Sequence, residues 1–283
     1  MGGMALYLPT VSSDGEPTVP QYIHGHHASV LRTYDQRTAA NSAAYLLPEL
    51  RPGHTLLDVG CGAGSITVDL AERVAPGRVV AVDTSREALD RAAQLARDRS
   101  VTTIEFRVGN ALDLDLPDGS VDVVHAHQVL QHVTDPVAGL REMRRVCRPG
   151  GVVAARDADY SAMVWWPPEP ALEGWRRLYR RVAEDGGGQP DAGRRLLSWA
   201  RAAGFESVTA TASTWCYADP AARELWSSSW ADRIRHSGIA QPALASGAAT
   251  EQQLQELAEG WLRWGRAEDA WFTIVHGEVL CRA

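Results

Sequence analysis

The sequence has no closely spaced cysteines and no long apolar run. Its four cysteines, Cys61, Cys147, Cys216 and Cys281, are far apart and form no C-x-x-C pair, which argues against a disulfide scaffold or a zinc ribbon. No stretch approaches the roughly 20 apolar residues that a membrane helix needs. The first residues also lack the basic and apolar regions of a signal peptide. We therefore expect a soluble, cytoplasmic protein with no membrane partner.

An excess of positive charge is also absent. The chain has 28 Lys and Arg against 35 Asp and Glu, for a net charge of −7. Proteins that bind nucleic acid neutralise phosphates with clustered Lys and Arg, so we expect no nucleic-acid partner. With 45% hydrophobic and 22% charged residues over 283 positions, the chain can bury a large core.

Strands and helices are predicted to alternate through the first half of the chain. Residues 1–20 are rich in Pro, Ser and Gly and predict a flexible leader, and TAANSAAYLL (38–47) predicts a helix that Pro48 stops. Predicted strands follow at HTLLDVG, RVVAVD, TIEFRVG, VDVVHAH and GVVAARD. Predicted helices lie between them at SITVDLAERVA, SREALDRAAQLARD (with Ser85 as N-cap) and DPVAGLREMRRVC. This order predicts a doubly wound α/β fold with a mainly parallel sheet.

The composition changes after residue 160. All ten tryptophans lie between Trp165 and Trp271. The stretch from MVWWPP to GGGQP predicts a loop and a helix, and RRLLSWARAAGF predicts a helix that ends at Gly204. ESVTATASTWCYA and AWFTIVHGEVLCR predict strands six and seven, with helices and a small-residue linker over 219–266 between them.

LLDVGCGAGS is the most specific motif in the chain. Gly60, Gly62 and Gly64 follow a predicted strand that ends at Asp58 and Val59, and they lead directly into a predicted helix. Glycines let the backbone approach a ligand closely, and a helix N-terminus offers unpaired N–H groups. Such a turn in a βαβ unit predicts a site for a nucleotide-like cofactor.

The spacing of this motif bears on the identity of the cofactor. The dinucleotide fingerprint is G-x-G-x-x-G, whereas here the third glycine comes one residue early. Asp58 would repel a pyrophosphate and attract the ammonium of an amino-acid-like group. Asp83, at the end of the second predicted strand, can accept hydrogen bonds from ribose hydroxyls, which suits NAD as well. An NAD(P)-dependent oxidoreductase is therefore an alternative that the spacing and Asp58 disfavour.

In LDVGCGAG, VVAVDTS, VGNALDLDLPDGSVDVVHAHQVLQHVTDP and MRRVCRPGG, the chain resembles class I S-adenosylmethionine-dependent methyltransferases of the small-molecule type, related to those of quinone biosynthesis. The resemblance covers residues 54–157 approximately. It implies a Rossmann-like seven-stranded sheet with an antiparallel last strand beside strand five, and a helical cap inserted between strands six and seven. It also implies that S-adenosylmethionine is bound by Arg37, Asp58, Gly60, Cys61, Gly62, Asp83, Thr84, Asn110, Ala111, His127 and Gln128. Asn110 departs from the acidic residue usual in the family, but it can still bond the exocyclic amine of adenine.

The same resemblance implies a single methyltransferase domain over residues 21–283. Residues 21–47 would form an N-terminal lid over the cofactor, and residues 161–190 and 219–266 the cap. The lid contains QYIHGHHASV, so Tyr22, His24 and His27 become candidates for a base that contacts the acceptor. The alternative is that they only order the lid. No metal site is predicted, because HGHHAS lacks the acidic residue of an H-x-H-x-D-H pattern and zinc needs three or four convergent ligands.

Aromatic residues of the cap are candidates for the acceptor pocket. Flat side chains suit an aromatic acceptor, and a homodimer interface would explain the same composition. Asp157 and Tyr160 follow strand five at the carboxyl edge of the sheet, where ligands bind. Trp199, Trp215 and Trp271 are predicted to be core residues, and His132 a packing or surface residue. The candidate acceptor-binding residues are Asp157, Tyr160, Trp165, Trp166, Trp226 and Trp230.

A weaker resemblance concerns the acceptor. YIHGHHASVLR and the Trp-rich cap resemble bacterial natural-product methyltransferases, some of which methylate indole carbons of tryptophan-derived cyclic dipeptides. This implies C3 of an indole as the methylated atom, with His24 or Tyr22 removing the indole N–H proton. N- or O-methylation of another small metabolite is an alternative, as is a non-catalytic member of the same fold. Methylation of protein or RNA fits poorly with the acidic balance of the chain.

Overall fold

A computed structural model, which describes residues 36–283, contains a seven-stranded sheet in the order β3-β2-β1-β4-β5-β7-β6. The first five strands pair in parallel, and β7 lies antiparallel between β5 and β6. This confirms the predicted doubly wound sheet and the place of its last strand. The strands are β1 (Leu56–Val59), β2 (Val79–Asp83), β3 (Ile104–Val108), β4 (Val121–His127), β5 (Cys147–Trp166), β6 (Val208–Tyr217) and β7 (Trp271–Arg282).

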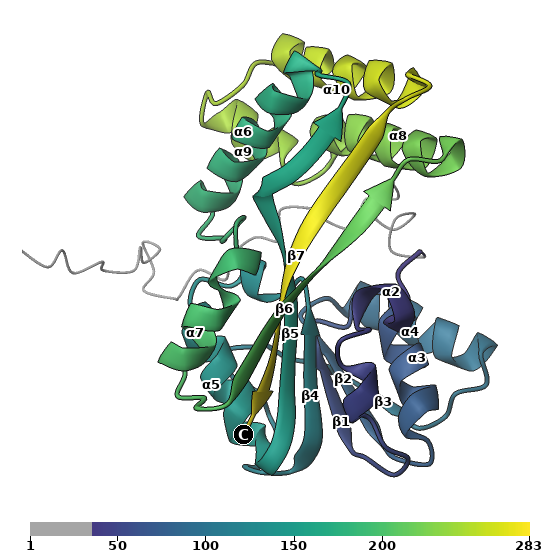
Figure 1. Cartoon of the computed structure of the whole chain (residues 1–283), viewed down its shortest axis with the longest axis vertical. Coiled ribbons are helices and arrows are strands. Elements are labelled where there is room, and N and C mark those ends of the chain that lie inside the picture. Colours follow the sequence, from purple (N-terminus) through teal and green to yellow (C-terminus); the bar gives the residue numbers. More distant parts are fainter. Residues whose placement is uncertain (1–35) are drawn as a thin grey trace, which may run out of the picture.

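Helices cover both faces of the parallel half of the sheet (Figure 1). On one face, α2 (Ala39–Ser42) and α3 (Ser65–Val74) bury apolar side chains against β1 and β4. On the other face, α5 (Pro136–Val146) and α7 (Leu196–Ala202) pack against β4, β5 and β7. In α5 the buried Leu140, Met143 and Val146 recur at the three-residue spacing that places side chains on one face of a helix. The helix α4 (Arg86–Asp98) begins at the predicted N-cap, Ser85, whose hydroxyl accepts from the Ala88 N–H at 3.2 Å.

Two predicted boundaries were wrong. The helix expected over 38–47 is only α2, followed by a 3₁₀ turn at Leu47–Glu49 that contains Pro48. This short helix begins at a capping box, in which Thr38 is the N-cap and Asn41 bonds back to it. The Asn41 side chain also donates to the Gln36 carbonyl. Such local bonds compete with continuation of the helix. The stretch MVWW is not a loop, because β5 continues to Trp166 in register with Trp271 of β7.

The far end of β5, β6 and β7 carries a helical cap (Figure 1). It consists of α6 (Pro170–Asp185), α8 (Pro220–His236), α9 (Ala240–Ala245) and α10 (Glu251–Arg266). The last three lie between β6 and β7 in the sequence, which confirms the predicted insertion, although α9 occupies the expected linker. Trp175 lies at the centre of the cap core, with its ring 4.5 Å from Trp230 and 4.8 Å from Trp261. In residues 36–283 no helix is long and apolar enough to cross a membrane.

Candidate active site

The glycine-rich turn between β1 and α3 forms one wall of a pocket at the carboxyl end of the parallel strands. Gly60, Gly62 and Gly64 have positive φ angles of 68°, 55° and 85°, a region that non-glycine residues rarely adopt. A Cβ on Gly64 would lie 2.6 Å from the Ala92 side chain, whereas a Cβ on Gly62 would meet nothing within 4 Å. Gly64 therefore allows α3 and α4 to pack closely, and Gly62 leaves open space in the pocket.

The structure brings all of the predicted cofactor-binding residues together. They come from the segment before α2, from the ends of β1, β2 and β4, and from the loop after β3. The pocket lining includes Arg37, Asp58, Gly60, Cys61, Gly62, Asp83, Thr84, Asn110, Ala111, His127 and Gln128.

Asp58 is held by two buried side chains. The Thr67 hydroxyl donates to Asp58 Oδ2 at 2.6 Å, and His125 Nδ1 lies 2.8 Å from Asp58 Oδ1. Both neighbours are fully buried, so the carboxylate has one fixed orientation at the pocket wall. Sequence reasoning gave no role to His125. Strand alternation could have found it, because His125 and His127 share a face of β4 and β4 pairs with β1.

Asp83 and Asn110 are oriented by backbone N–H groups. Asp83 Oδ2 accepts from Gly62 N at 2.8 Å and Oδ1 from Ser85 N at 2.9 Å. Each carboxylate oxygen has a second lone pair, which can accept from a hydroxyl of a ligand. Asn110 Oδ1 accepts from Leu112 N at 3.0 Å. This bond fixes the orientation of the amide and uses neither of the two N–H donors on Nδ2.

His127 and Gln128 end β4 beside the pocket. Both ring nitrogens of His127 are buried and lack a hydrogen-bond partner among the described residues. Burial, and then the charges of Arg156 and Arg37, hold the pKa of His127 well below its usual value, so the ring is neutral near pH 7. Gln128 has a φ of 55°, a strained conformation that is often found at functional sites.

Gln128 links the pocket to β7 and to the segment before α2. Its Oε1 accepts from Arg37 Nη2 at 2.9 Å, and its Nε2 donates to His276 Nε2 at 2.9 Å. The Trp215 ring lies 4.5 Å from His276 and 5.6 Å from His127. Trp215 is only half-buried, so its prediction as a core residue was wrong. Together these three rings form an aromatic wall, which we name by its members, Trp215, His127 and His276.

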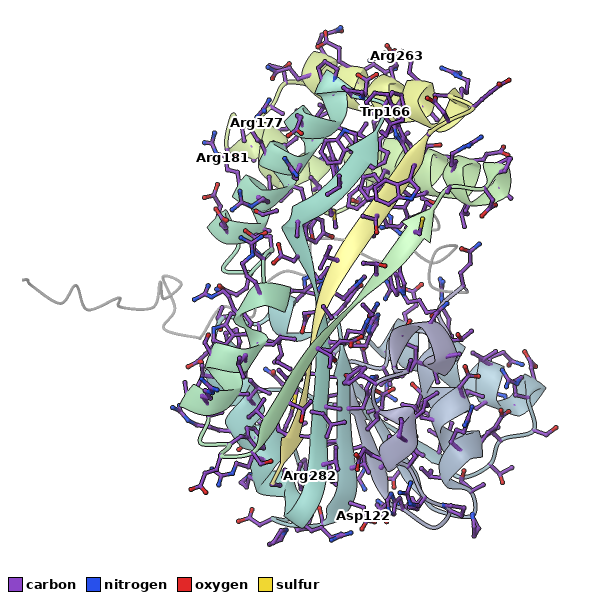
Figure 2. All side chains as sticks on the ribbon, viewed as in Figure 1. Asp122, Trp166, Arg177, Arg181, Arg263 and Arg282 are labelled. Atoms are coloured by element: carbon purple, nitrogen blue, oxygen red, sulfur yellow. The ribbon has the colours of Figure 1, made fainter. Side chains whose placement is uncertain are left out.

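The predicted acceptor-binding aromatics do not line this pocket. Trp226 stacks on Tyr217 at 4.2 Å, and Trp230 is buried in the cap core. Trp165 stacks on Phe272 at 5.8 Å. Trp166 is 54% exposed, and Figure 2 shows it at the cap end of the molecule. These tryptophans were placed from composition alone, and the helices of the cap use most of them for mutual packing.

Two further predicted acceptor residues, Asp157 and Tyr160, are also buried outside the pocket. Tyr160 stacks on Tyr179 at 3.9 Å. Asp157 accepts from Gln131 N at 3.1 Å, and burial raises the pKa of its carboxyl group to about 8. His132, in the same short turn as Gln131, lines the pocket, and burial lowers its pKa to about 4.

The remaining expectations concern other parts of the chain. Tyr22, His24 and His27 lie outside the described residues. In residues 36–283 no group of three His, Cys, Asp or Glu side chains is placed to hold a metal ion. Trp199 is a core residue as predicted, but Trp271 is 39% exposed and its prediction as core was wrong.

Comparison with known proteins defines the class. A family model described as a methyltransferase domain matches residues 50–204. An uncharacterized methyltransferase of Schizosaccharomyces pombe is 34% identical over 268 residues, which cover 92% of this chain and 95% of the relative. The probable methyltransferase ltbC of Aspergillus luteorubrus is 28% identical over 277 residues, covering 92% and 96%. The solved YcgJ protein of Bacillus subtilis has the same fold, with a TM-score of 0.55 at 18% identity over 84% of this chain and 96% of that one.

The chain belongs to the methyltransferase domain family. It is an S-adenosylmethionine-dependent methyltransferase, and this decides against the NAD(P)-dependent alternative. The pocket fits this cofactor. Gly62 leaves room for a ligand against the backbone, and Asp83 can accept from ribose hydroxyls. His127 lines the pocket, and its ring nitrogens have no hydrogen-bond partner among the described residues. When bound, S-adenosylmethionine supplies an activated methyl group.

Proposed function

We propose that this methyltransferase acts on a small aromatic acceptor of the natural-product type. The observation that carries the proposal is the aromatic wall of Trp215, His127 and His276, of which His127 lines the cofactor pocket. Flat rings stack favourably on such a wall. A relative from Geobacillus, named demethylmenaquinone methyltransferase, also supports an aromatic acceptor. It is 34% identical to this chain over 131 residues, which cover 46% of this chain and 52% of the relative.

The charge around the wall argues against an amine acceptor. The guanidinium carbons of Arg37 and Arg156 lie 5.2 Å and 4.9 Å from the centre of the Trp215 ring. These two cations also contribute to the low pKa of His127 and of His276. Glu278 pairs with Arg156 at 3.2 Å and offsets part of this charge. Two guanidinium groups, two neutral imidazoles and one carboxylate together still disfavour an ammonium group and accommodate a neutral or anionic ring.

In its most specific form, the proposal places the methyl group on C3 of the indole in a tryptophan-derived cyclic dipeptide. A bond forms between C3 and the methyl carbon as the bond from that carbon to sulfur breaks, and the indole N–H proton passes to a base. Tyr22, His24 and His27 are the proposed bases. N- or O-methylation of another small metabolite is the alternative. In either case the enzyme accelerates transfer mainly by holding the acceptor in line with the methyl group.

Mass spectrometry of product mixtures tests this function. Purified protein would be incubated with S-adenosylmethionine and, separately, a tryptophan-containing cyclic dipeptide, a simple indole, a phenol, a naphthoquinol and an aliphatic amine. We expect a gain of one methyl group on an aromatic acceptor, and fragmentation would assign it to C, N or O. Methylation of the aliphatic amine alone would overturn the proposal.

Single substitutions test the proposed bases. Tyr22→Phe, His24→Ala and His27→Ala would each be assayed for turnover and for affinity toward S-adenosylhomocysteine. The residue that accepts the proton should lose turnover by roughly 10²–10⁴-fold with its cofactor affinity retained. Equal losses of both would assign a structural role. His236→Ala is a matched control, since His236 pairs with Asp232 on the exposed side of α8.

The homodimer and the cytoplasmic location are further parts of the proposal. Analytical ultracentrifugation of the full chain would test the first, and cell fractionation the second.

A further inference from the structure

Arg156 is a fully buried cation with unused hydrogen-bond donors. It lies on β5 directly beside His127 of β4 in the parallel register, and its side chain is 0% exposed. Its Nε donates to Ser213 Oγ at 3.1 Å and to Glu278 Oε1 at 3.2 Å. Its two terminal nitrogens, Nη1 and Nη2, have no hydrogen-bond partner among the described residues. Buried donors without a partner lose their bonds to water and gain nothing in return.

The partner carboxylate of Arg156 is held from the other side. Glu278 lies on β7, and its Oε2 accepts from the Thr211 hydroxyl at 2.8 Å while its Oε1 accepts from the Ser213 hydroxyl. Thr211 and Ser213 both belong to the edge strand β6. Glu278 therefore bonds Nε of Arg156 and the two hydroxyls of β6, and no residue that the structure describes bonds the terminal guanidinium nitrogens.

The surroundings of these nitrogens include residues that lie next to the cofactor pocket. The Arg156 guanidinium lies over the same Trp215 ring as that of Arg37, which lines the cofactor pocket. The hydroxyl of Tyr45 is also buried, and no residue in 36–283 forms a hydrogen bond with it. Glu278, Arg156 and Asp157 all influence its pKa, which burial raises. Buried donors of Arg156 and Tyr45 thus lie close to the wall of Trp215, His127 and His276, and no described residue accepts a hydrogen bond from them.

We propose that the terminal nitrogens of Arg156 bind an sp² oxygen of the methyl acceptor, either of a carboxylate or of an amide carbonyl, while its aromatic ring lies against Trp215. A planar guanidinium donates two parallel hydrogen bonds to a carboxylate and also bonds a carbonyl. The inference rests on the proposed function only in taking the acceptor to be aromatic. It makes Arg156 a specificity-determining residue, and it disfavours acceptors that carry an ammonium group at the same place.

Matched indoles provide the test. The acceptors would be indole-3-acetate, indole-3-acetamide, 3-ethylindole and tryptamine, which place a carboxylate, a carbonyl, an alkyl group and an ammonium at the same distance from the ring. We expect kcat/KM for the acetate and the acetamide to exceed that for 3-ethylindole by roughly 10- to 100-fold, as for a hydrogen bond to a charged group. Tryptamine should be the poorest acceptor. The acetate and acetamide arms distinguish the carboxylate from the carbonyl.

A paired substitution tests the assignment to Arg156. Arg156→Met combined with Glu278→Gln removes both charges, because loss of Arg156 alone would strand a buried carboxylate. The preference for oxygen-bearing indoles should disappear in this variant, with affinity for S-adenosylhomocysteine retained. Arg282→Met with Glu49→Gln is the control, since this pair, 2.7 Å apart, lies at the opposite end of the sheet from the cap (Figure 2). The control should keep the preference.

Each outcome separates this inference from the proposed function. Equal methylation of all four indoles by the wild-type protein would overturn the inference alone, and this result does not depend on any variant folding. A preference that survives the paired substitution would also overturn it, because the preference would then come from residues other than Arg156. Methylation of aliphatic amines with no reaction on any aromatic acceptor would instead overturn the proposed function.

Discussion

Gly62→Ala is the substitution that most directly separates the cofactor site from the stability of the fold. Gly62 has a φ of 55°, and a Cβ built on it would meet no protein atom within 4 Å. Gly53 is a matched control, because it has a φ of 91°, equally open surroundings and a place outside the pocket. Both substitutions impose the left-handed backbone on alanine, but only Gly62→Ala puts a methyl group into the pocket.

The magnitudes follow from this geometry. A non-glycine residue in the left-handed region costs roughly 1–2 kcal/mol, so Gly53→Ala and Gly62→Ala should lower the free energy of unfolding by similar amounts. Each kilocalorie corresponds to a fall in Tm of about 2–4 °C for a domain of some 150–250 residues. We expect Gly62→Ala to weaken binding of S-adenosylhomocysteine at least tenfold, or about 1.4 kcal/mol, and Gly53→Ala to leave it unchanged.

Circular dichroism melts and isothermal titration calorimetry with S-adenosylhomocysteine measure the two effects. If Gly62→Ala bound this product as tightly as Gly53→Ala does, the open space above Gly62 would not be where the cofactor lies, and the reasoning would be refuted. Gly64→Ala adds an internal reference. Its new Cβ would lie 2.6 Å from Ala92, so it should lose more stability than either of the other two variants.

Three further predictions concern buried groups. Thr67→Val removes the hydroxyl that donates to Asp58 at 2.6 Å, and we expect urea unfolding to show a loss of about 1.5–3 kcal/mol, against almost none for the exposed Thr102→Val. Asp157 has a pKa of about 8 in the folded protein against ~3.9 when unfolded. The folded state therefore retains a proton that the unfolded chain releases, and stability should fall as pH rises between these values. Asp157→Asn should flatten that fall, and an unchanged slope between pH 5 and pH 8 in urea titrations would contradict the assignment. Trp230→Ala should cost about 3–5 kcal/mol of stability with S-adenosylhomocysteine binding retained, whereas a selective loss of acceptor turnover would return Trp230 to the acceptor site.

Sequence reasoning succeeded where local chemistry decides the structure. Gly60, Gly62 and Gly64 require a tight turn whatever surrounds them, and Ser85 caps α4 through a bond to a residue three positions later. It failed where the outcome depends on distant partners. The MVWW stretch is a strand only because Trp271 and its neighbours in β7 pair with it.

The same division applies to the site. All of the predicted cofactor-binding residues line one pocket, because they follow strands whose parallel pairing the alternating pattern already implied. The tryptophans of the cap were misplaced, since composition cannot tell a side chain that faces a ligand from one that packs between helices. Trp230 is buried in the cap core, and Trp215, expected in the core, lies against His127 and His276 instead.

By itself, the sequence determined the methyltransferase fold and the cofactor, and it identified residues that line one pocket, because glycines, strand ends and caps act over a few residues. Only the tertiary structure brought together the residues that we propose to face the acceptor. Arg156, Trp215 and His276 come from β5, β6 and β7, and they meet because β7 inserts antiparallel between the other two strands. Their register joins residues that are far apart in the chain, and no local pattern records it.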